Sequence, residues 1–193
     1  MKRFIALSIL IAGFAFNANA QKKEQQKIKA VIDDVIVLTE NGEYSKVLDH
    51  TYPALFKLMP KEALAEQMDE IFNSTEMKIS MNNFTTGKVG EIKQGETAEY
   101  AIVPYNYSMS MRYTTDEATE EMVNLTAGIL IEQFGEDKVT VEAETKTIVI
   151  ENESEMLAIR DNGTEDWKII ELKAEQMQMM EMILPADVYE AVK

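Results

Sequence analysis

The sequence contains no cysteine and only one histidine, His50. Without cysteine the chain can form no disulfide, can use no thiolate as a nucleophile or redox group, and can build no zinc site on sulfur ligands. A single imidazole also excludes the zinc patterns that need two or three histidines. P-loops, nucleophile elbows and dinucleotide fingerprints are missing as well. We therefore expect no cofactor and no metal site, and we assign no catalytic residue.

Basic residues are scarce. The chain carries 19 Lys and Arg against 34 Asp and Glu, a net charge of −15, and the acids are dispersed among apolar residues. Such a surface repels nucleic-acid phosphates and anionic lipid headgroups. We expect neither a nucleic-acid partner nor binding to an anionic membrane surface.

Long apolar runs are absent except at the start of the chain. There Lys2 and Arg3 precede the apolar run Phe4–Phe16, and Ala18-Asn19-Ala20 gives a small-x-small pattern. This combination predicts a signal peptide over residues 1–20, cleaved after Ala20, and the run is too short to span a bilayer of about 30 Å. No cysteine is present to carry a lipid. We expect a soluble periplasmic or extracellular product that is not a lipoprotein and keeps no stable membrane attachment.

The remaining residues, 21–193, are predicted to form a single domain with residues 174–193 as a C-terminal helical extension. Apolar residues at helical spacing predict three helices in its first third. They cover residues 22–40, a short stretch from about Glu43, and the stretch from Pro60 to Phe72, where Leu64 and Met68 belong to the apolar stripe.

The pattern then changes to alternation, which is typical of strands. Residues 77–82 predict one strand, Gly87 and Gly90 belong to a weaker one, and residues 99–113 predict a long one. Pro104 indicates a bulge, an edge or a bend in the long strand, because proline offers no hydrogen to a strand ladder.

A fourth helix is predicted over residues 116–134, with a Thr114–Glu117 capping box and Gly135 as a left-handed stop. Asp161-Asn162-Gly163 predicts a hairpin turn. The remaining predicted elements are strands at 139–143, 147–150, 156–159 and 167–172, and a methionine-rich helix broken at Pro185.

Helices followed by sequential antiparallel strands indicate an α+β fold: N-terminal helices on a strongly curved antiparallel sheet, with one inserted helix and a C-terminal helix. The helical stretch Glu43–Phe72, the tyrosine-rich strand and the closing strand with Asp166-Trp167-Lys168 resemble the nuclear transport factor 2-like superfamily. The Leu184-Pro185 step resembles the end of its small exported bacterial members. The resemblance implies a cone that encloses a pocket, with the helix at 116–134 inserted over one rim.

One face of the long strand carries the residues most suited to line such a pocket. They are Tyr105, Tyr107, Met109, Met111 and Tyr113, and we add Trp167 from the closing strand. The same residues also suit a filled aromatic and methionine core. The sequence thus favours an exported non-enzymatic protein that binds a small apolar ligand or a protein partner, and it leaves homodimerisation open.

Two other functions compete with binding. The superfamily resemblance implies an isomerase or dehydratase, which needs a carboxylate beside a tyrosine, but no Asp or Glu lies between Tyr105 and Tyr113 on their strand face. Adjacent Asp49 and His50 point about 100° apart on a helix and form no dyad by themselves. A Cu(I) carrier needs converging thioethers. Its candidates, which are spread over two helix faces as in a core, are Met177, Met179, Met180 and Met182.

Overall fold

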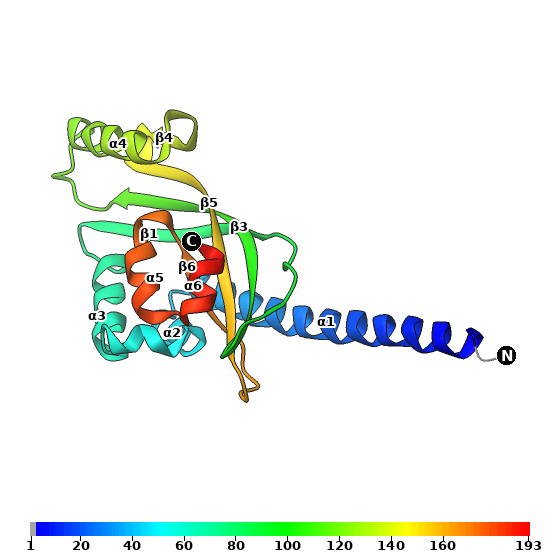
Figure 1. Ribbon diagram of the computed structural model, residues 1–193. Helices are drawn as coiled ribbons and strands as arrows, with labels where there is room; N and C mark the ends of the chain where they lie inside the picture. The colour runs from blue at the N-terminus through cyan, green and yellow to red at the C-terminus, as the bar shows by residue number, and fades with distance from the viewer. Residues whose placement is uncertain (1–2) are drawn as a thin grey trace.

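The computed structural model describes the backbone of residues 3–193 and the side chains of residues 21–193, so the predicted signal peptide lies outside the fully described residues. The fold is α+β, with helices and one antiparallel sheet that does not close into a barrel (Figure 1). The helices are α1 (Arg3–Glu40), α2 (Tyr44–His50), α3 (Lys61–Phe72), α4 (Glu120–Phe134), α5 (Met177–Ile183) and α6 (Ala186–Val192). The strands are β1 (Met77–Thr86), β2 (Lys93–Gln94), β3 (Ala98–Tyr113), β4 (Val139–Glu142), β5 (Thr147–Asp161) and β6 (Lys168–Leu172).

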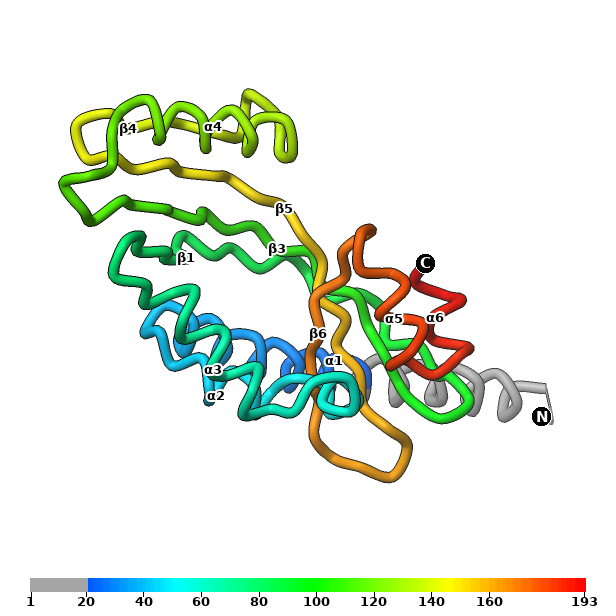
Figure 2. The backbone as a smooth tube through the Cα atoms, turned by 90° about the vertical axis from the view of Figure 1, so that its left-hand side faces the viewer, coloured from blue at the N-terminus to red at the C-terminus, as the bar shows by residue number. Residues whose placement is uncertain are grey.

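Two long strands, β3 and β5, form the centre of the sheet. They pair without interruption from Ala98–Asp161 to Arg112–Thr147. One half of the sheet has the order β1-β3-β5-β4, and in the other half β2 pairs with β3 while β6 pairs with β5. Figure 2 shows β3 and β5 curving from one half into the other.

The prediction of two strands at 147–150 and 156–159 is wrong, because both belong to β5. The polar stretch from Glu151 to Glu155 interrupts the apolar pattern, yet each of its residues stays paired with β3. Polar residues suit this stretch because its side chains alternate between exposed and partly covered positions at the bend. Hydrogen bonding between strands therefore continues where the apolar pattern stops.

The ladder between β1 and β3 ends beside Pro104, whereas the bulge lies in β1 between Asn82 and Thr85, and Pro104 itself stays paired with Glu155 of β5. β1 pairs with β3 up to Thr86–Tyr105 after a bulge, in which Asn83 has a φ of 56°. Gly87 then donates its N–H to the Pro104 carbonyl at 2.8 Å. A Cβ on Gly87 would lie 2.8 Å from Pro104 Cγ, so this close approach requires glycine.

Helices cover the two halves of the sheet differently. Beside β6, α1 packs Ile28 and Ile32 on one face, and α5 and α6 pack Met180 and Val188 on the opposite face. In the β4 half, α4 packs on Ile148 and Ile150, which lie on the same face of β5 as the residues below α1. Figures 1 and 2 show α4 at one end of the bent sheet, apart from α2 and α3.

The ends of α4 differ from the prediction. Thr119 caps the helix by accepting a hydrogen bond from the Met122 N–H at 3.2 Å, whereas Thr114 donates to the Thr75 carbonyl at 2.6 Å. The Thr114–Glu117 capping box is therefore wrong, because Thr114 is used to hold the loop before α4. Gly135 does end the helix, with a φ of 101° and an extended ψ of 149° that is not the left-handed helical conformation.

Candidate functional site

An apolar cleft of about 480 Å³ lies between the sheet and the N-terminal helices. Its walls are the C-terminal half of α1, α2, the turn at Pro53–Lys57, α3 and the sheet, and Gln176 and Met179 at the start of α5 also line it. The lining residues are overwhelmingly aliphatic, aromatic or methionine side chains, and they include Val35, Val47, Leu55, Leu64, Met68, Phe72, Met81, Phe84, Met156 and Ile169.

The α3 wall is unusual because none of its twelve residues is buried. Leu64, Met68 and Phe72 form the apolar stripe of this helix, and all three line the cleft. A surface helix normally buries its apolar stripe against the protein. Here the stripe is only partly covered, and the space it faces is the cleft.

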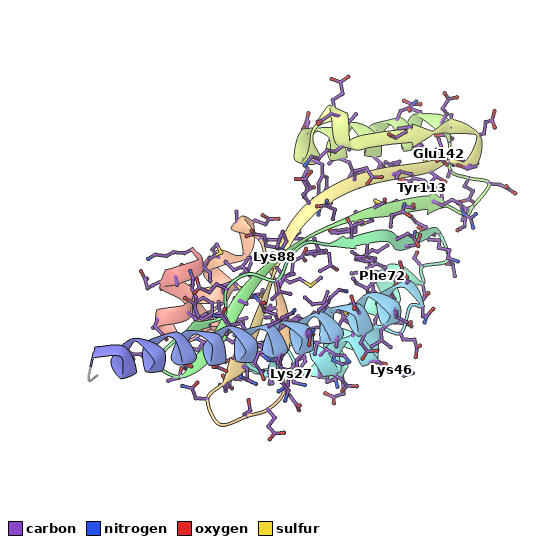
Figure 3. All side chains as sticks on the ribbon, turned by 90° about the vertical axis from the view of Figure 1, so that its right-hand side faces the viewer. Lys27, Lys46, Phe72, Lys88, Tyr113 and Glu142 are labelled. Atoms are coloured by element: carbon purple, nitrogen blue, oxygen red, sulfur yellow. The ribbon has the colours of Figure 1, made fainter. Side chains whose placement is uncertain are left out.

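Aromatic stacking closes the cleft at the end of α3. Tyr44 of α2 stacks on Phe72 with the ring centroids 4.3 Å apart. Figure 3 labels Phe72 at this end of α3. Leu58 also lines the cleft while remaining exposed to solvent. The stack therefore forms part of the wall, and the apolar lining includes a residue that solvent reaches, Leu58.

A polar group forms part of the wall on the sheet side. The Tyr105 hydroxyl donates to Glu171 Oε1 at 2.6 Å, and the Ser154 hydroxyl donates to the same oxygen at 3.0 Å. Lys173 Nζ lies 3.1 Å from Glu171 Oε2. Tyr105 and Glu171 both line the cleft. Burial raises the pKa of the Tyr105 phenol, and the Glu171 charge raises it further, so this hydroxyl stays protonated.

Charge pairing keeps Lys173 ionised in the same cluster. Burial is the largest single influence on the pKa of Lys173 and lowers it, but the charge of Glu171, the hydrogen bond to it and the nearby Tyr107 and Glu175 together raise the pKa above its ordinary value. Glu171 thus accepts from three donors. Its carboxylate is anchored beside the cleft as a fixed acceptor.

The structure separates the six residues predicted to line a pocket. Tyr105 lines the cleft. Tyr107 stacks on the Tyr105 ring within the core, and its hydroxyl accepts a hydrogen bond from Asn152 Nδ2 at 2.7 Å. Met111 and Tyr113 pack in the cluster beneath α4, and Met109 bridges that cluster and the one beneath α1.

Trp167, the sixth predicted residue, lies in the core away from the cleft lining. Its indole N–H donates to Glu24 Oε2 at 3.0 Å, and the Arg160 guanidinium lies over its ring, 4.6 Å from the centroid. Trp167 therefore ties the sheet to α1.

Sequence reasoning missed Glu171 and the helical walls. Ile169 and Glu171 alternate along β6, and Trp167 directly precedes the strand in the same register; Trp167 and Ile169 belong to the core beneath α1. An acidic residue in the inward register of a strand is the signal that could have identified Glu171. The sequences of the wall helices show an apolar face at helical spacing, but this spacing does not show which part of the protein that face contacts.

The two remaining candidate groups do not converge. Asp49 pairs with Lys61, while His50 Nε2 lies 3.0 Å from Asp34 Oδ2, so Asp49 and His50 turn to different partners. Met180 is fully buried and Met182 is 63% exposed. Met177 and Met179 are partly buried and pack on the core cluster that contains Met180, and Met179 also lines the cleft. The exposed Met182 is therefore set apart from the other three thioethers. Within residues 21–193 no three His, Asp or Glu side chains are grouped to hold a metal ion.

Neither a protein-family model nor a curated protein matches this chain. In the part of the chain open to description, no helix combines the length and apolarity needed to cross a bilayer.

Proposed function

We propose that this protein binds a small apolar molecule bearing one uncharged hydrogen-bonding group in the cleft between α1–α3 and the sheet. The observation that carries the proposal is the apolar stripe of α3, which has no buried residue and faces the cleft. An apolar ligand would complete the burial that the protein alone leaves unfinished.

The cleft volume sets the expected ligand size and affinity. About 480 Å³ falls within the range of small-molecule sites. A ligand of roughly 20 non-hydrogen atoms gains about 0.3 kcal/mol per atom, or about 6 kcal/mol in total. That corresponds to a Kd of tens of micromolar.

Glu171 sets the expected polar preference. An alcohol can donate to this carboxylate, whereas a fatty-acid carboxylate would face it as a like charge. The net charge of −15 acts in the same direction. We therefore expect a neutral alcohol to bind more tightly than the carboxylate of the same chain length.

We also propose a superfamily, a location and an alternative occupant of the cleft. Three helices before a bent antiparallel sheet support membership of the nuclear transport factor 2-like superfamily. The pattern at residues 1–20 supports export to the periplasm or beyond. A protein segment, including one from a second copy in a homodimer, is the alternative occupant of the cleft.

A second candidate function is an isomerase or dehydratase, and the contact between Tyr105 and Glu171 favours it. Such enzymes place a carboxylate and a phenol around a developing oxyanion. Binding alone is the better supported function, because the Tyr105 hydroxyl donates its one hydrogen to Glu171 itself and has none left to stabilise a developing oxyanion. A small β,γ-unsaturated ketone in D₂O separates the two. Deuterium uptake that disappears in Glu171→Gln would establish the enzyme and contradict the binding-only proposal.

The binding proposal is tested with the neutral fluorophore N-phenyl-1-naphthylamine. Met68→Lys places a charge on the α3 wall, and we expect the Kd to rise at least tenfold because burying an unpaired ammonium is costly. Leu125→Lys is the matched control, since Leu125 is 69% exposed on α4. Equal binding by Met68→Lys and wild type, or equal loss in the control, would refute the proposal. Circular dichroism checks that both variants fold.

A further inference from the structure

A second hollow, of about 350 Å³, lies on the other face of the sheet in its β4 half. Four of its residues form a row across four strands through successive pairs: Lys78 with Arg112, Arg112 with Thr147, and Thr147 with Glu142. The neighbouring residue on β5, Ile148, points the opposite way into the core beneath α4. This hollow is therefore separate from the apolar cleft.

Two cations stand side by side at one end of the row. Lys78 and Arg112 are direct cross-strand partners, an arrangement in which like charges repel. Among side chains of residues 21–193, the ion pairs formed involve neither of them. In a chain with 34 acidic residues, two adjacent cations without a carboxylate partner form a local site for an anion.

Hydroxyl groups line the hollow beside the cations. Ser80 and Ser110 are the next cross-strand pair on this face, and Thr147 follows Arg112 along the row. Ser80 and Ser110 are half-buried and Thr147 is buried. Small polar side chains leave the hollow open to a ligand while offering it hydrogen-bond partners.

The opposite end of the row carries a carboxylate. Glu142 Oε2 accepts a hydrogen bond from the Thr145 hydroxyl at 3.0 Å, which holds it at the β4 side. Two strand spacings, roughly 10 Å, separate the backbones of Glu142 and Arg112. Figure 3 labels Glu142, together with Tyr113 of β3, at this end of the sheet. The hollow therefore has two cations at one end, hydroxyl groups in the middle and the Glu142 carboxylate, a hydrogen-bond acceptor, at the other end.

We propose that this hollow binds a small hydroxylated oxyanion, such as a uronic acid or a sugar phosphate. Arg112 and Lys78 take the anionic group, since a guanidinium fork and an ammonium both pair well with carboxylate and phosphate. Glu142 accepts from ligand hydroxyls at the other end, because hydroxyl donors need acceptors. The proposal rests on neither the cleft nor its ligand.

Isothermal titration with glucuronate, glucose 6-phosphate, glucose and inorganic phosphate tests the proposal. We expect both acidic sugars to bind the full protein at low ionic strength, inorganic phosphate to bind at least tenfold more weakly, and glucose not to bind. The variant K78Q/R112Q should raise the Kd of glucuronate at least tenfold. The control variant K57Q/K88Q changes net charge equally, through exposed lysines that do not line the hollow, and should leave the Kd unchanged.

Three outcomes would overturn the proposal. One is absence of binding by either acidic sugar at 20 mM, and another is equal loss in the two double variants, which would mean non-specific attraction. Inorganic phosphate binding as tightly as glucuronate would refute the role of the hydroxyls. Glu142→Gln provides a further check: it removes a like charge near inorganic phosphate, so phosphate affinity should rise. A fall in phosphate affinity would contradict the assigned roles.

Discussion

Replacing Glu24 with glutamine should destabilise the protein in a pH-dependent way. Glu24 lies on α1, where its carboxylate accepts from the Trp167 indole at 3.0 Å and pairs with Arg160 at 2.7 Å and Lys27 at 2.8 Å. Arg160 also pairs with Glu99 on β3. The cluster joins α1 to the sheet through ion pairs. Glu24→Gln removes the negative charge with which Arg160 and Lys27 pair.

The expected loss of unfolding free energy follows from the pKa of Glu24, which folding lowers from 4.5 to about 2. The hydrogen bond from Lys27 is the largest cause, the hydrogen bond from Trp167 and the positive charges of Arg160 and Lys27 add to it, and burial opposes them. Taken alone, such a shift corresponds to about 3 kcal/mol. Glu24 is 23% exposed and Lys27 is 46% exposed, so solvent screening reduces the expected loss to about 1–2 kcal/mol.

The sign of the pH dependence follows from the lowered pKa. A carboxyl group whose pKa is lower when folded stabilises the protein above its unfolded pKa, and this contribution disappears as pH falls towards about 2. The difference in unfolding free energy between wild type and Glu24→Gln should therefore be full at pH 7 and smaller at pH 3.

Urea unfolding measures this difference. Trp167 is the only tryptophan and contacts Glu24 directly, so its fluorescence reports on the cluster. The control, Glu43→Gln, loses only an exposed pair with Lys46 and should unfold like wild type. An equal loss at pH 7 and pH 3, or no loss at pH 7, would refute the electrostatic account.

Two further predictions concern packing. Gly87→Ala should cost about 1–3 kcal/mol, because its Cβ would meet Pro104, whereas Gly128→Ala on the exposed side of α4 meets nothing and should be neutral or stabilising; reversed effects in urea unfolding would contradict the geometry. Met180→Ala should cost about 2–5 kcal/mol, while Met182→Ala should cost little, and equal losses in thermal unfolding would show that the burial of α5 is wrongly assigned.

Local periodicity predicted most of the elements. The stripes at 22–40 and 60–72 and the alternation at 99–113 match α1, α3 and β3, because burial of one face imposes a period on the sequence. β5 was split in the prediction because hydrogen bonding to β3 continues through residues 151–155 without apolar side chains. Thr119 caps α4 because tertiary contacts place Thr114 elsewhere.

The candidate site was harder to predict than the elements. Tyr105 lies on the expected strand face, yet its neighbours Tyr107 and Met109 pack in the core. Whether an inward position is filled or open depends on which helix covers it, and sequence spacing does not contain that information. Glu171 reaches Tyr105 from a strand 66 residues later in the chain. Its inward register is visible in the sequence, but its partner is not.

Methyl NMR of methionine-labelled protein tests the central claim most directly, because the chain has 13 methionines in different environments. Met68, Met81 and Met156 line the cleft, whereas Met122 and Met182 are exposed outside it. On titration with 1-decanol, the account predicts saturable shifts of the methyl signals of Met68, Met81 and Met156, which are among the methionines that line the cleft, and unchanged signals from Met122 and Met182. Unchanged cleft signals, or shifts of equal size at all five methyl groups, would contradict ligand binding in the cleft.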